Sequence, residues 1–171
     1  MNANKDFIFR AAKGKKIMPE IIKKSATLRG FSVTPSDFLH LEQTDKIKER
    51  FFNFVKNGSG FKCYFSRENI DRFFIRLEEK DFNEIDERLL LFGSFDEYVG
   101  ALLVPLSFVY NNKNTIFEFV EQDLAMATID LTHGFCLELN YYDQDGTYVK
   151  EGIFELTAWG FFEEIFKLPV E

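Results

Sequence analysis

Residues able to bind a metal ion or act as a nucleophile are few in this chain of 171 residues. It has two histidines, His40 and His133, and two cysteines, Cys63 and Cys136. His133 and Cys136 are three positions apart in an expected strand, where alternate side chains point to opposite faces. They do not converge as zinc ligands do without help from a turn at Gly134. We therefore expect no metal site and no cofactor.

Two glycine-containing loops have the residue types of functional sites but not their spacing. In the run Asp-Gln-Asp-Gly at 143–146, aligning Gly146 with the glycine of a calcium loop puts Tyr141 at the first ligand position and Gly152 where a glutamate is required. The run instead predicts a hairpin turn. Ser59 lies in Asn-Gly-Ser-Gly, which lacks the five-residue pattern of a nucleophile elbow.

Other catalytic patterns give no support for an enzyme. The sequence contains no phosphate-binding glycine loop and no dinucleotide fingerprint. A cysteine and a histidine could meet in space by chance, and with 28 acidic residues a pair of carboxylates can always be nominated. The sequence therefore predicts no catalytic residue and a protein that is not an enzyme.

The uneven distribution of charge is the most informative feature. Residues 1–60 hold 12 Lys or Arg and 6 Asp or Glu, a balance of +6, whereas residues 61–171 hold 9 and 22, a balance of −13. The sequence pI is about 5.0. Nucleic-acid binders usually present a basic domain, because counterion release drives their binding. We expect no nucleic-acid partner, and the lysine-rich segment 11–24 is expected to be a solvated helix face or a counterpart to the acidic half.

Hydrophobic periodicity predicts helices followed by strands. Thr44 is a candidate N-cap for a helix closing at Asn57-Gly58, and Ser66 is a candidate start for a second helix. Alternation in 134–142 places Phe135, Leu137, Leu139 and Tyr141 on one face of a strand. The expected helices are 19–26, 44–57, 66–79, 96–100 and 161–166, with a polar join at 80–87; the expected strands are 7–10, 61–65, 89–92, 102–110, 115–121, 134–142 and 148–158.

These elements predict one α+β domain over residues 1–171, with a helical part at about 1–88 and a sheet-rich acidic part at about 89–171. The N-terminal helices should pack on one face of a mostly antiparallel sheet that ends in a C-terminal β-meander and a short terminal helix. The other face would then be available for contact. The 22 phenylalanines supply ample apolar area for such a core.

The cellular setting expected from the sequence is the cytoplasm. No stretch approaches the roughly 18 apolar residues of a membrane span, and the first residues lack the pattern of a secretory signal. Two cysteines far apart in sequence fit a reduced compartment better than a disulfide framework. We expect no membrane association, and a monomer before binding, with a dimer left open.

A carboxylate-rich patch speeds encounter with a cationic partner, and aromatic residues within it can anchor the complex. The working hypothesis is that acids and tyrosines of the C-terminal half form such a patch. The partner would be a basic protein. The residues expected to contact it are Asp96, Glu97, Asp123, Asp130, Glu138, Tyr142, Asp143, Asp145, Tyr148 and Glu151.

The stretch FEFVEQDLAMATIDLTHGFCLELNYYDQDG, in a small, acidic, cysteine-poor chain, gives a general resemblance to the cytoplasmic immunity proteins of bacterial toxin systems, including contact-dependent growth inhibition. The resemblance lies in overall character and carries no shared motif. It implies a protein that binds and blocks a cognate toxin domain, commonly a basic nuclease, without catalysis. Two alternatives stay open: a small-ligand-binding domain or enzyme with an aromatic-lined pocket between helices and sheet, and an oligomeric structural subunit.

Overall fold

The structure is a computed structural model that describes residues 3–58, 60–79, 88–143 and 145–167. The expectations for Ser59 and for the polar join at 80–87 lie outside the described residues. Within these ranges one antiparallel sheet of six strands has the order β1-β6-β5-β4-β2-β3. Its strands are β1 Phe61–Ser66, β2 Leu89–Phe92, β3 Leu102–Val104, β4 Leu124–Ala127, β5 Gly134–Tyr142 and β6 Tyr148–Trp159. The predicted α+β class is confirmed.

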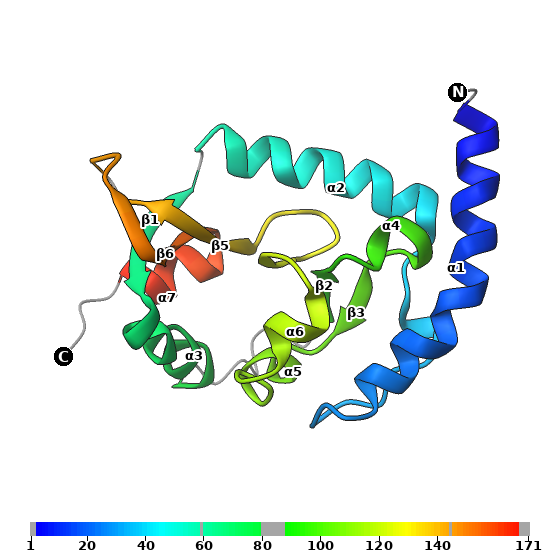
Figure 1. The fold of residues 1–171 in the computed structure, drawn as a ribbon, viewed down its shortest axis with the longest axis horizontal. Coiled ribbons are helices and arrows are strands. Elements are labelled where there is room, and N and C mark those ends of the chain that lie inside the picture. Colours follow the sequence, from blue (N-terminus) through cyan, green and yellow to red (C-terminus); the bar gives the residue numbers. More distant parts are fainter. Residues whose placement is uncertain (1–2, 59, 80–87, 144, 168–171) are drawn as a thin grey trace.

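The helices lie on both sides of this sheet (Figure 1). Alternation in β2 sends Leu89 and Leu91 to one face and Leu90 and Phe92 to the other. The first face packs against α3 (Ile70–Glu79), α5 (Ser107–Tyr110), α6 (Ile116–Val120) and α7 (Phe161–Lys167). The second packs against α2 (Leu41–Lys56), so the N-terminal helices α2 and α3 do not share a face.

Phenylalanine rings fill the core between the sheet and its helices. Phe73 of α3 stacks on Phe166 of α7 with ring centroids 5.2 Å apart, and its edge meets Phe135 of β5 at 5.4 Å. On the opposite face Phe51 of α2 packs against Trp159 of β6 at 5.3 Å. Each ring buries a large apolar area, which fits the expectation that this composition supplies a core.

The N-terminal region differs from its prediction. One helix, α1, covers Ala3–Ser25, where a strand at 7–10 and a separate helix at 19–26 were expected. A short apolar run such as 7–9 does not distinguish helix from strand by its periodicity. Pro19 lies inside α1 and does not end it, although proline removes one helical hydrogen bond.

The structure differs from the prediction at four further places between residues 41 and 127. Residues 102–110 divide into β3 and α5 around Pro105, and 115–121 forms α6 instead of a strand, because Ile116, Phe119 and Val120 are buried at helical spacing. The strand β4 was not predicted, since its four buried residues show no alternation. α2 begins at Leu41, three residues before the expected N-cap.

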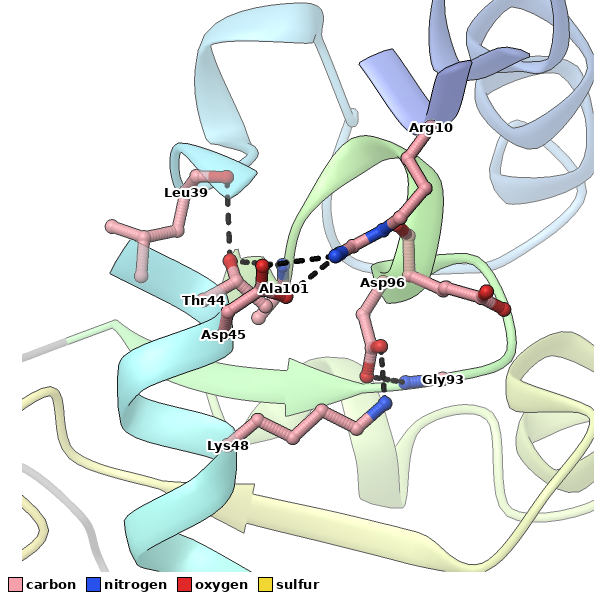
Figure 2. Close-up of polar contacts among 9 residues, drawn as sticks. Arg10, Leu39, Thr44, Asp45, Lys48, Gly93, Asp96 and Ala101 are labelled. Atoms are coloured by element: carbon pink, nitrogen blue, oxygen red, sulfur yellow. Dashed lines mark hydrogen bonds and ion pairs between the residues drawn. The ribbon is translucent and has the colours of Figure 1, made fainter. Parts of the chain in front are cut away.

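A short helix, α4 (Asp96–Val99), is the junction between α1 and α2 (Figure 2). The Arg10 guanidinium donates to both carboxylate oxygens of Asp45, with Nη1–Oδ2 at 3.0 Å and Nη2–Oδ1 at 2.7 Å. Its Nε donates to the Glu97 carbonyl at 2.7 Å. The Thr44 hydroxyl, inside α2, accepts the Ala101 N–H at 3.0 Å. These bonds fix α1 and α2 against α4.

The same junction contains a buried ion pair. The Asp96 side chain is 1% exposed and pairs with the Lys48 ammonium of α2, while the Gly93 N–H donates to its other oxygen at 3.3 Å. Burial raises the pKa of Asp96, and the hydrogen bond and charge of Lys48 partly offset that rise. The ionised form of Asp96 therefore depends on Lys48.

We predict that Lys48→Met destabilises the fold more at pH 7 than at pH 4. At pH 7 the variant leaves an ionised carboxylate buried without its partner, which costs on the order of 3 kcal/mol. Because the folded-state pKa of Asp96 is raised above 3.8, lowering the pH to 4 protonates a larger share of this carboxyl than of a free one, and the loss shrinks. Urea unfolding at both pH values measures the difference.

Lys46→Met is the matched control. Lys46 lies on the same helix in an exposed pair with Glu42, and such pairs contribute little, so the change should stay below about 0.5 kcal/mol. A loss for Lys48→Met that is equal at pH 4 and pH 7 would contradict the role assigned to the buried pair.

Candidate protein-binding surface

The structure brings together seven of the ten residues expected to contact a partner. They lie on the β5–β6 hairpin or directly beside it. Glu155 of β6 belongs with them and was not among the ten. The β5–β6 surface is defined here as Asp123, Glu138, Tyr142, Asp143, Asp145, Tyr148, Glu151 and Glu155.

The other three residues lie elsewhere. Asp96 is buried in its ion pair with Lys48, so its inclusion was wrong: a side chain with 1% exposure cannot reach a partner. Glu97 is exposed but lies on α4, beside α1. Asp130 is in the loop before β5, and the nine residues of β5, at roughly 3.3 Å each, separate it from the hairpin turn.

Asp130 has a structural role in its own loop. Its carboxylate accepts hydrogen bonds from the Thr128 hydroxyl at 2.6 Å and from the Thr132 hydroxyl at 2.8 Å and N–H at 3.0 Å. These bonds lower the pKa of Asp130 to about 2. The Asp130 carboxylate therefore stabilises its own loop through Thr128 and Thr132.

Three carboxylates crowd together on the face of the sheet that α2 covers in part. In the register of β5 and β6, Glu138 lies directly opposite Glu155. Lys62 of β1 pairs with Glu155, with Nζ–Oε1 at 2.9 Å. Asp123 precedes β4 and accepts the Leu139 N–H at 3.4 Å. Like charges directly opposite on neighbouring strands are destabilising.

The pKa values of Glu138 and Asp123 reflect this environment. Burial raises the pKa of Glu138, and the charges of Asp123 and Glu155 raise it further, against a smaller lowering by Lys62. Burial also raises the pKa of Asp123. The surroundings therefore disfavour the ionised form of both groups, and a cation placed nearby would stabilise that form.

The end of the hairpin combines exposed rings with acids. Tyr142 and Tyr148 are 56% and 63% exposed, and their ring centroids lie 6.0 Å apart. Asp143 accepts the N–H groups of Asp145 at 3.0 Å and Thr147 at 2.7 Å, which fixes the turn. The two exposed tyrosines therefore lie next to the hydrogen-bonded Asp143, at one end of the strand pair.

N-terminal lysines neutralise part of the acidic half, but outside this surface. Lys24 of α1 pairs with Glu121, which follows α6, and Lys48 pairs with Asp96. Lys62, at the edge of the surface, pairs with Glu155. Within the described ranges, Asp123, Glu138, Asp143, Asp145 and Glu151 form no salt bridge, and the exposed Lys150 of β6 lies among them in sequence.

The metal and thiol candidates do not form a reactive site. Among the described residues, no group of three His, Cys, Asp or Glu side chains could hold a metal ion. Burial raises the pKa of Cys63 to about 11 and also raises that of Cys136, so both remain thiols near neutral pH. His133 Nδ1 accepts the Phe161 N–H at 3.1 Å.

No described helix has both the length and the apolar character needed to cross a membrane. Comparison with models of protein families, with known proteins and with solved structures gives no match for this chain.

We predict that Glu138→Gln stabilises the protein at neutral pH. Because the folded state raises the pKa of Glu138, its ionisation opposes folding above that pKa and has no effect at pH 3, where the group is protonated in both states. Removing the charge should add about 0.5 kcal/mol at pH 7. Chemical unfolding at pH 7 and pH 3 tests this.

The exposed Glu151 on the same hairpin provides the control. Glu151→Gln should leave the free energy of unfolding within about 0.3 kcal/mol, as surface substitutions usually do. If Glu138→Gln were destabilising at pH 7, the carboxylates would not be crowded as described.

Proposed function

We propose that this chain is a non-catalytic binding protein that captures a cationic protein partner through the β5–β6 surface. One observation carries the proposal: Glu138 faces Glu155 in the register of two rigid strands, with Asp123 beside them and Lys62 paired to Glu155. The protein keeps a like-charge arrangement that costs it stability. A lysine or arginine of the partner would remove the repulsion between these carboxylates, and this would favour binding.

The remaining parts of the surface fit the same function. Clustered carboxylates attract a cationic protein over a distance and raise its association rate. Exposed tyrosines such as Tyr142 and Tyr148 are typical anchors once contact is made, because they add large area at small entropic cost. Tyr142 and Tyr148 lie opposite each other in the register of β5 and β6.

Within this class, we propose a toxin domain as the partner and immunity as the function. A nuclease toxin needs a basic surface to bind phosphates, and an acidic protein that covers this surface blocks its activity by binding alone. This requires no catalytic group and no cofactor in the immunity protein.

The proposal predicts that a gene directly upstream encodes a secreted protein with a basic C-terminal domain, and that domain is the partner to test. Its association with this chain should be measured by stopped flow between 50 and 500 mM salt, conditions chosen so that screening varies strongly. The surface variant is Asp123→Asn, Glu138→Gln, Asp145→Asn, Glu151→Gln. It should lower the low-salt association rate about tenfold or more and flatten the salt dependence, and cells producing it should lose protection from the toxin.

The matched control removes the same number of charges elsewhere, at exposed positions on α1, α2, α3 and α7: Glu20→Gln, Glu49→Gln, Glu78→Gln, Glu164→Gln. It should change the rate by less than about threefold, since only the general field of the protein is altered. An equal effect of the two variants, or an association rate that does not respond to salt, would reject the proposal.

A further inference from the structure

An apolar groove of about 790 Å³ is lined by residues of α1, α4 and the start of α2. In Figure 1, α1 and α4 lie at the opposite end of the molecule from the β5–β6 hairpin. One wall is α1, the other is the segment from Pro35 to Leu41 at the start of α2, and Tyr98 and Val99 of α4 also line it. It differs from the pocket expected between helices and sheet, because helices and a loop form it.

The sequence of α1 builds one wall of the groove. Phe7, Ala11, Met18 and Ile22 recur at helical spacing and all line it. Gly14 brings α1 against α4, since a Cβ there would lie 2.0 Å from the Tyr98 carbonyl oxygen. The wall is therefore held in place, together with the Arg10 bonds of the junction.

The charge at the groove is positive. Its lining residues include no Asp or Glu, and they include Lys15 and His40. Lys15 is exposed and forms no ion pair within the described ranges. The neighbouring Lys13 lies over the Tyr98 ring, 3.8 Å from its centroid. A ligand with an apolar body and a negative end would complement this groove.

We propose that the groove binds a free long-chain aliphatic carboxylate, with the carboxylate at Lys15 and the alkyl chain running past Ala11 towards Phe7. The volume lies within the roughly 300–1,000 Å³ of small-ligand sites. The lining runs from Phe7 to Ile22 on α1 with Lys15 near its middle, which leaves roughly 12 Å between Lys15 and Phe7 at 1.5 Å per residue for an extended alkyl chain. This site is separate from the β5–β6 surface and independent of the proposed function.

Titration calorimetry with the full chain tests the ligand class. Dodecanoate, kept below its micelle concentration, should bind saturably with one site per chain. Dodecanol should bind more weakly because it lacks the charge, and dodecyltrimethylammonium should bind weakest because it carries the wrong sign.

Two pairs of neighbouring identical residues on α1 provide matched variants. Ala11 lines the groove and Ala12 does not; Lys15 lines it and Lys16 does not. Ala11→Phe fills the groove and should weaken dodecanoate binding at least tenfold. Lys15→Glu should weaken dodecanoate at least fivefold, leave dodecanol within twofold and favour dodecyltrimethylammonium. Ala12→Phe and Lys16→Glu should each stay within twofold of the native chain.

Circular dichroism melting checks that each variant folds. If Ala11→Phe does not fold, the comparison of Lys15→Glu with Lys16→Glu tests the proposal instead. The proposal fails if dodecanoate does not saturate, if the cationic amphiphile binds as well, or if the control variants lose as much affinity as their partners. It also fails if the chain dimerises and Ala11→Phe abolishes the dimer, because the occupant would then be a second copy.

Discussion

The register of β5 against β6 determines what this sheet buries and what it exposes. Successive side chains of a strand point to opposite faces, and a slip of one residue would exchange them. With Phe135 and Leu137 buried beneath α3 and α7, Glu138 must lie on the other face, where it meets Glu155. The hydrophobic core thus enforces the like-charge contact, and the fold cannot relieve it without losing burial.

The contacts at α4 keep the basic helix α1 away from the acidic β5–β6 hairpin. Arg10 and the buried pair of Lys48 and Asp96 hold the basic helix α1 at one end, while the acidic hairpin lies at the other (Figure 1). Basic and acidic segments that are distant in sequence therefore stay apart in space, except where lysines reach individual acids. The two ligands proposed above, a cationic protein and an aliphatic carboxylate, correspond to these two ends of the molecule.

The sequence predicted elements whose pattern is local. The alternation of 134–142 and the turn chemistry that follows it led to β5, β6 and the hairpin, because one face of the sheet is buried and the turn needs its Asp and Gly residues. It did not predict α6 or β4, whose short apolar runs fit either structure until tertiary packing decides. Asp96 was predicted to contact a partner for a similar reason. Nothing near it in sequence indicates that it is buried in an ion pair with Lys48 of another helix.

The central claim is that carboxylates on the β5–β6 surface are crowded and lack sufficient compensation. Carboxyl-detected NMR titration of Glu138 in the free protein and in a Glu155→Gln variant measures this directly. The account predicts a pKa above the ordinary 4.5 in the native chain and a lower pKa in the variant, because the charge of Glu155 raises it. A native pKa at or below 4.5, or one that the variant does not lower, would remove the physical basis for binding a cationic partner.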